Sequence, residues 1–165
     1  MSAEKKKQMG VLGLIVCLMI TLIGSLLFVG AVSGWFDEPK VNIDAEYRTD
    51  TPELKDINRE EYQSLIDEKK SFVVFVDQNE CTTADRLRGY MNDYIKEHGM
   101  VAYRIMFSEA KESSLHDFVK YYPSVAIVDK GVAKFFLRAD SDEDVEPYND
   151  YGAFRGWMDG HLLFE

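Results

Sequence analysis

The chain has 165 residues, of which 46% are hydrophobic, and its 19 basic and 29 acidic side chains give a formal net charge of −10. Because nucleic-acid binding requires a basic surface, this charge balance argues against a nucleic acid as partner. The length is sufficient for one domain of ordinary size plus an appendage.

The appendage is predicted at the N-terminus, as a membrane span. Residues 9–36 contain no charged side chain and are mostly apolar. Crossing the hydrocarbon core takes about 20 apolar residues, whereas the apolar part of a signal peptide has only about 7–15. We therefore expect a transmembrane anchor at 9–36, although Ala31 and Ser33 leave cleavage as an alternative. Gly30 and Gly34 have the spacing that lets two membrane helices pack closely.

The charges that flank this span predict its orientation. Lys5–Lys7 precede it, whereas Asp37 and Glu38 follow it. Since basic residues remain on the cytoplasmic side, we expect residues 1–8 in the cytoplasm and residues 37–165 outside it, extracytoplasmic in a bacterium or lumenal in a eukaryote. The chain should then be a single-pass membrane protein.

A linker is expected between the span and the domain. Residues 37–53 are polar and contain Pro39 and Pro52, a composition typical of a linker that holds a domain away from a membrane. The domain itself is expected at 54–165, beginning with a short edge strand at 54–57.

Helix and strand patterns alternate in the rest of the chain. Asn58, with Glu61 three residues later, predicts the capped start of a helix. Residues 72–76 form an uninterrupted apolar run, typical of a strand buried on both faces, and residues 87–95 carry an apolar stripe at helical spacing. Later elements are expected as a strand at 100–107, a short helix at 113–122, a hairpin of strands at 124–128 and 132–137, a charged loop at 140–146, and a last helix around Phe154 and Met158.

This alternation predicts the fold class. Strands separated by helices pair in parallel, and the hairpin adds antiparallel pairings. We expect an α/β fold with a central mixed β-sheet and helices on both faces.

The order of elements resembles the thioredoxin fold over roughly residues 54–162. Residues 54–76 look like the opening strand, helix and central strand of a thioredoxin. Cys81 falls where that family has its first active-site cysteine, and the stretch YYPSVAIVDKGVAKFFL at 121–137 is similar to the family's cis-proline and following hairpin. The resemblance implies a thioredoxin-like domain, here preceded by one N-terminal transmembrane helix.

The resemblance also implies where a site would lie. Cys81 would be the candidate nucleophile, at the start of a helix. Pro123 would be the cis-proline that faces Cys81 across a substrate groove. Thr82, Thr83 and Tyr122 would contact a bound polypeptide beside them.

Most of the family's catalytic residues are missing from this sequence. The family's second cysteine would fall at Ala84, the tryptophan that often precedes the first cysteine would fall at Glu80, and the buried aspartate of thioredoxins would fall at Phe75. The scaffold therefore matches the family better than the chemistry does.

The cysteines limit the chemistry further. Cys17 lies within the expected span and cannot meet Cys81, so no intramolecular disulfide is expected. Cys81 is then either a small buried hydrophobic residue or a reactive thiol. A helix N-terminus stabilises a thiolate, whereas the nearby carboxylates of Glu80 and Asp85 oppose it.

Disulfide exchange with turnover needs a second thiol, so an autonomous dithiol enzyme is not expected. Two functions remain: a binding or accessory module for a protein partner or an unfolded polypeptide, which is the interpretation we favour, and a one-thiol oxidoreductase in which Cys81 forms mixed disulfides. Neither requires a cofactor.

No metal site is expected. Asp140, Asp142 and Asp144 resemble the start of a calcium loop, but the sixth and twelfth positions of that loop are Val145 and Tyr151 instead of glycine and glutamate. A solvated acidic loop explains the three aspartates.

Overall fold

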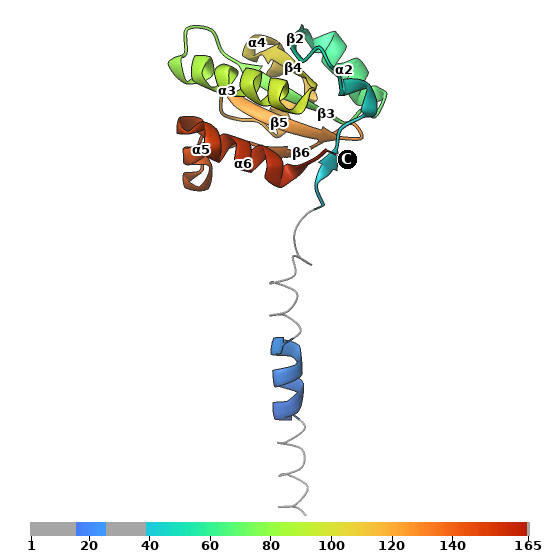
Figure 1. The fold of residues 1–165 in the computed structure, drawn as a ribbon, viewed down its shortest axis with the longest axis vertical. Coiled ribbons are helices and arrows are strands. Elements are labelled where there is room, and N and C mark those ends of the chain that lie inside the picture. The colour runs from blue at the N-terminus through green and yellow to red at the C-terminus, as the bar shows by residue number, and fades with distance from the viewer. Residues whose placement is uncertain (1–15, 26–38, 165) are drawn as a thin grey trace, which may run out of the picture. The chain divides into compact units, whose positions relative to one another are not determined.

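The computed structural model describes residues 16–25 and 39–164, and the chain divides into two compact units, Met1–Pro39 and Lys40–Glu165 (Figure 1). In the first unit, residues 16–25 are helical. Within the described ranges, no helix is long and apolar enough to cross a membrane.

Most of the anchor expected at 9–36 lies outside the described residues. The same is true of residues 1–8 and of Gly30 and Gly34. The transmembrane anchor, its orientation and the helix–helix contact therefore stay predictions.

A five-stranded mixed sheet forms the centre of the second unit. Its strands are β2 (Glu53–Ile57), β3 (Phe72–Asp77), β4 (Val101–Met106), β5 (Ser124–Asp129) and β6 (Val132–Phe136), in the order β2-β4-β3-β5-β6. β4 runs parallel to both β2 and β3, whereas β5 is antiparallel to β3 and β6 is antiparallel to β5. This arrangement confirms the predicted α/β, thioredoxin-like fold.

The helices of the second unit are α2 (Arg59–Asp67), α3 (Thr82–His98), α4 (Phe107–Ala110), α5 (Val145–Asn149) and α6 (Tyr151–His161), with 3-10 turns η1 (Ala45–Tyr47), η2 (Ser114–Asp117) and η3 (Asp142–Asp144). The helices expected after Asn58, at 87–95 and around Phe154 are present, and two short helices, α4 and α5, were not predicted. α2 has the predicted cap, since the Asn58 side chain accepts from the Glu61 N–H and the Glu61 side chain accepts from the Asn58 N–H, both at 2.9 Å. α3 ends at Gly99, whose φ of 60° suits glycine.

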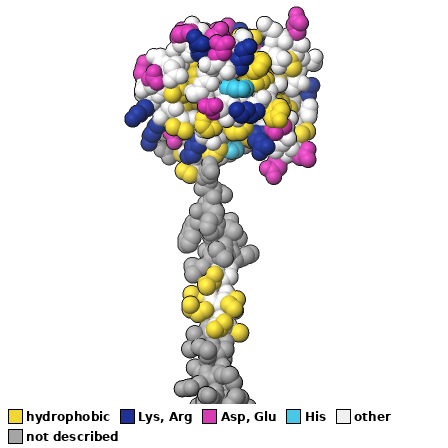
Figure 2. Space-filling model, turned by 180° about the vertical axis from the view of Figure 1, so that it is seen from behind, with side chains coloured by type: hydrophobic (Ala, Val, Ile, Leu, Met, Phe, Trp, Pro, Cys, Tyr) yellow, Lys and Arg dark blue, Asp and Glu magenta, His cyan; other side chains and the backbone are white. Residues whose placement is uncertain are grey.

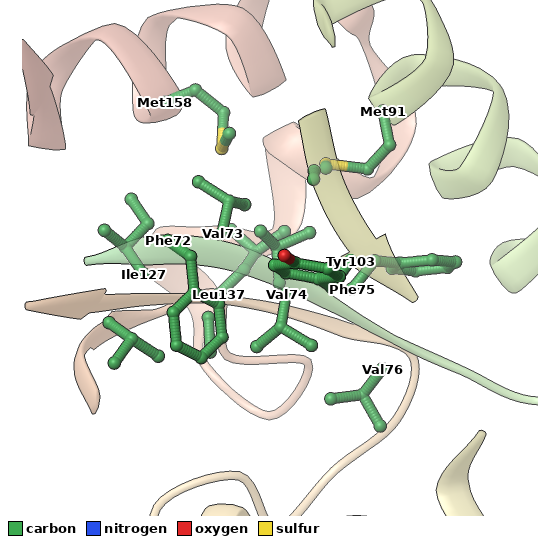
Figure 3. Close-up of a cluster of buried hydrophobic side chains, with 14 of the residues drawn as sticks. Phe72, Val73, Val74, Phe75, Val76, Met91, Tyr103, Ile127, Leu137 and Met158 are labelled. Atoms are coloured by element: carbon green, nitrogen blue, oxygen red, sulfur yellow. The ribbon is translucent and has the colours of Figure 1, made fainter. Parts of the chain in front are cut away.

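Strand β3 is the centre of the core. Residues 72–76 are all fully buried, with 0% of each side chain exposed, so neither face of the strand contacts water. Successive side chains point to opposite faces. Figure 3 shows Val73 on the same side as Met91 of α3. On the other face Phe72 packs edge-on against Tyr62 of α2, with ring centroids 6.1 Å apart.

The linker expected at 37–53 is shorter than predicted. The compact unit begins at Lys40, and β1 (Val41–Asn42) pairs in parallel with β7 (Leu162–Leu163). Ile43 is buried beside it, at 2% exposure. The prediction was wrong for this segment because its few apolar residues find their partners near the other end of the sequence, which local composition does not reveal.

The helix expected at 113–122 was also predicted too long. Only the one-turn helix α4 and the 3-10 turn η2 form between β4 and β5. Pro123 restricts only Tyr122 directly before it, whereas η2 already ends at Asp117, and the next residue, Phe118, is 42% exposed. The charged loop expected at 140–146 contains η3 and the start of α5.

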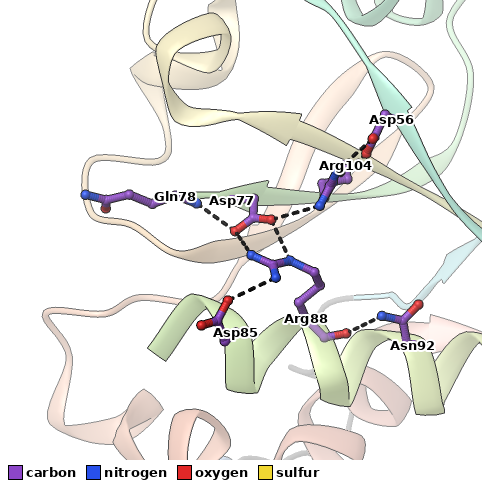
Figure 4. Close-up of polar contacts among 7 residues, drawn as sticks. All are labelled: Asp56, Asp77, Gln78, Asp85, Arg88, Asn92 and Arg104. Carbon is purple, nitrogen blue, oxygen red and sulfur yellow. Dashed lines mark hydrogen bonds and ion pairs between the residues drawn. The ribbon is translucent and has the colours of Figure 1, made fainter. Parts of the chain in front are cut away.

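A buried ion-pair network closes the end of β3 (Figure 4). The Asp77 carboxylate is 1% exposed and accepts hydrogen bonds from Arg88 of α3 at 2.7 and 2.9 Å. Arg104 of β4 lies 3.4 Å from the same carboxylate and also donates to Asp56 of β2. That hydrogen bond holds the pKa of Asp56 below its ordinary value. The network links three strands to α3.

We expect Asp77→Ala to lower the free energy of unfolding by about 2–3 kcal/mol, because two arginines lose the charged group that accepts their hydrogen bonds. The matched control is Asp85→Ala, which removes an exposed partner of Arg88 and should cost less than about 1 kcal/mol. Urea denaturation followed by circular dichroism measures both. Equal effects of the two substitutions would contradict a structural role for Asp77.

Candidate functional site

A groove opens at the N-terminus of α3. It has a volume of about 340 Å³ and is formed by three segments of the chain. Its lining residues are Cys81, Thr83, Tyr122, Pro123, Ala139, Val145, Tyr148 and Asn149. Of the five residues expected at the site, four line the groove together, whereas Thr82 is exposed at the first position of α3 outside the lining.

Cys81 is the N-cap residue of α3 and is partly exposed. Its side chain makes no capping hydrogen bond, while its carbonyl accepts from the Asp85 N–H at 3.0 Å. The residue before it, Glu80, has a φ of 57°, so the loop from β3 turns sharply just ahead of the thiol. The thiol therefore lies where the free N–H groups of a 17-residue helix point.

Ala84 occupies the position that the resemblance assigns to a second cysteine. It is fully buried, with 0% of its surface exposed, one turn along α3 from Cys81. Since Cys81 is the one cysteine in the sequence from Lys40 onward, the groove has a single sulfur. The thiol of Cys81 is therefore accompanied by the methyl group of Ala84, and not by a second thiol, at the start of α3.

The wall opposite Cys81 is the Tyr122–Pro123 peptide, which is cis, as the resemblance implied. The Tyr122 hydroxyl donates to the Val119 carbonyl at 2.7 Å and lies 3.0 Å from His116 Nδ1. Its ring contacts Phe107, with centroids 4.1 Å apart. Burial raises the pKa of Tyr122. These contacts hold the aromatic side of the wall in place.

Tyr148 of α5 also holds the Pro123 wall in place. The sequence did not predict this role. The buried Tyr148 hydroxyl lies 2.9 Å from the Pro123 carbonyl and 3.0 Å from the Leu137 carbonyl, to either of which it can donate. Ser124 also donates to Leu137, at 2.6 Å. Desolvation raises the pKa of Tyr148. A tyrosine among charged residues, outside any periodic stripe, gave no signal of this role.

Asn149, in the third wall of the groove, is joined to α3 by hydrogen bonds. Arg86 donates to the Asn149 side chain at 2.7 Å, and the Tyr90 hydroxyl donates to the Asn149 carbonyl at 3.1 Å. The helix that carries Cys81 therefore also positions the far side of the groove.

Two carboxylates of the acidic loop near the groove contact Arg138, near the start of that loop. Asp140 lies 3.6 Å from Arg138, and Asp144 accepts from the Arg138 N–H at 2.7 Å. In the described part of the chain, no group of three or more potential ligand residues is arranged to hold a metal ion.

No family model matches the chain, and no curated protein matches it. Similar solved structures include the oxidised thioredoxin of Plasmodium falciparum, with 17% identity, a TM-score of 0.44, and coverage of 57% of this chain and 92% of that one. The thioredoxin of Trypanosoma brucei brucei has 13% identity and a TM-score of 0.47, and the match covers 66% of this chain and 93% of that one. Likeness at this level says nothing of activity.

We expect Tyr148→Phe to lower the free energy of unfolding by about 1–2 kcal/mol, because it leaves the buried Pro123 carbonyl without a donor. The matched control is Tyr151→Phe, since the Tyr151 hydroxyl bonds Glu97 at an exposed site. That change should stay within about 0.5 kcal/mol. Denaturant titration of both variants decides the point, and an unchanged midpoint for Tyr148→Phe would show that the hydroxyl does not support the wall.

Proposed function

We propose that this thioredoxin-like domain is a polypeptide-binding or accessory module that performs no dithiol redox turnover. The observation that carries the proposal is a groove whose walls are fixed by hydrogen bonds while its second thiol position is the buried Ala84. Residues 9–36 would hold the domain at a membrane, with residues 37–165 outside the cytoplasm.

The composition of the groove suits a polypeptide. Pro123, Val145 and Tyr122 offer apolar surface, while Thr83 offers a hydroxyl group for hydrogen bonding. A main chain with alternating side chains can use both kinds of contact. Because the walls are already held by the Tyr148 and Asn149 hydrogen bonds, binding would cost little ordering of the protein.

Catalytic turnover in disulfide exchange is not expected, because the groove has no second thiol to resolve a mixed disulfide. If the Cys81 thiolate attacked a partner's disulfide, one S–S bond would break, a mixed disulfide would form, and one partner thiolate would leave. Releasing the remaining half requires a second thiolate, and residue 84 supplies only a methyl group.

A one-thiol oxidoreductase is the second candidate. It is favoured by the partial exposure of Cys81 at the start of α3, where the helix dipole stabilises a thiolate. In that case an external small thiol, such as glutathione, would resolve the mixed disulfide and be consumed in doing so.

The proposed membrane anchor is inferred from the uncharged residues 9–36 and from Lys5–Lys7, which precede them. We expect the full chain to remain with membranes washed in alkaline carbonate. A fragment beginning at Asp37 is the control and should be released. Release of the full chain would contradict the anchor.

We expect the wild-type chain not to accelerate the reduction of insulin by dithiothreitol, whereas Ala84→Cys should accelerate it. The substitution supplies the second thiol, so that a disulfide forms between Cys81 and the introduced cysteine as insulin is reduced, and dithiothreitol then reduces that disulfide. The double substitution Cys81→Ser with Ala84→Cys is the control and should be inactive.

The same assay separates the two candidates. Acceleration by the wild-type chain with glutathione as reductant, lost in Cys81→Ser, would establish the one-thiol enzyme. Acceleration by the wild-type chain with dithiothreitol alone, equal to that of Ala84→Cys, would contradict the proposal of no dithiol turnover.

A further inference from the structure

A second groove adjoins the Cys81 groove. It has a volume of about 170 Å³ and is lined by residues 118–121 and 136–140. We propose that it extends the binding site and takes an apolar side chain of the partner polypeptide, next to an acidic residue that pairs with Lys120. This inference rests on the proposed function and names the kind of segment that the site binds.

The two grooves lie next to each other, because the segment 118–123 and Ala139 contribute to the lining of both. Ala139 lines both of them. Tyr121 lines the second groove, and the next residues, Tyr122 and Pro123, line the first. A chain bound beside Cys81 can therefore pass over Ala139 into the second groove while staying extended.

Exposed apolar side chains gather at these grooves. Among the described residues of the domain, the large hydrophobic side chains that stay exposed are Phe118, Tyr121, Val132, Val145 and Leu163. Phe118 and Tyr121, at 42% and 54% exposure, line the second groove, and Val145 lines the first. Clustering of this kind marks an interaction surface, whereas single exposed residues are ordinary.

The size of the second groove favours one side chain over a small ligand. Sites for small molecules usually have volumes of about 300–1,000 Å³, and this groove has about 170 Å³. Within the segment 113–122 only the turn η2 forms, and Phe118, directly after it, is exposed and lines this groove.

The charge of Lys120 favours an acidic residue in the partner, next to the apolar side chain that enters the groove. At the rim of the groove, Arg138 is paired with Asp140 at 3.6 Å. Lys120, which also lines the groove, makes no ion pair with any residue that the structure describes. On the face of the domain seen in Figure 2, acidic and basic side chains are interspersed. An unpaired lysine beside an apolar groove, in a chain of net charge −10, favours a carboxylate there.

The test uses the full-length chain in a mild detergent. The probe is fluorescently labelled α-lactalbumin that has been reduced and carboxymethylated. This treatment makes it an acidic chain without a fixed structure. Fluorescence anisotropy gives the Kd. We expect Tyr121→Ser in the second groove and Val145→Ser in the first each to raise the Kd about fivefold. Val132→Ser removes an equally exposed side chain elsewhere and should leave the Kd unchanged.

Lys120→Glu tests the charge without disturbing apolar packing. It should raise the Kd about threefold at low salt, with the difference shrinking at about 0.5 M salt. The control is Lys111→Glu, a charge reversal outside both grooves, which should have no effect.

The outcomes separate the two proposals. If Val145→Ser weakens binding while Tyr121→Ser and Lys120→Glu match their controls, the extension is wrong and the proposed function stands. If the wild-type chain does not bind the probe, both are wrong. If Tyr121→Ser instead converts a dimer into a monomer in sedimentation, the second groove binds another copy of this chain, and the extension is also wrong.

Discussion

The Asp77 carboxylate is the constraint on which the geometry of the site depends. A carboxylate that is 1% exposed must be paired, and here Arg88 from α3 and Arg104 from β4 provide the donors. The pairing fixes the start of α3 against the end of β3. Asp77 also accepts from the Gln78 N–H at 2.7 Å, at the first residue of the loop that leads to Cys81. The position of the thiol is therefore set by an ion pair that the thiol itself does not touch.

The shape of the groove is determined by contacts between parts of the fold, and not by a reactive side chain. Its walls come from α3, the cis-proline segment and α5, and hydrogen bonds from Tyr148 and Arg86 join them. None of these contacts involves the Cys81 sulfur. A groove built in this way does not depend on a second thiol for its shape, and the buried Ala84 lies beside it.

The sequence predicted the parts of the structure that local pattern determines. The run at 72–76 indicated a strand buried on both faces, and Asn58 with Glu61 indicated a cap, because these signals lie within a few residues of one another. The cis state of Pro123 came from the resemblance and not from the residues themselves.

The parts that were missed depend on contacts between distant residues. Local composition predicts a linker at β1, because the strand that pairs with it, β7, lies about 120 residues later in the sequence. The roles of Tyr148 and of Arg104 have no periodic or compositional signal, since each depends on which segments the fold brings together.

The most direct test of the account compares binding by the wild-type chain and by Cys81→Ser. Both are titrated against reduced, carboxymethylated α-lactalbumin, which has no disulfide to exchange. We expect equal dissociation constants, because the groove and not the sulfur makes the contacts. Loss of binding in Cys81→Ser, or no binding by either chain, would contradict this expectation.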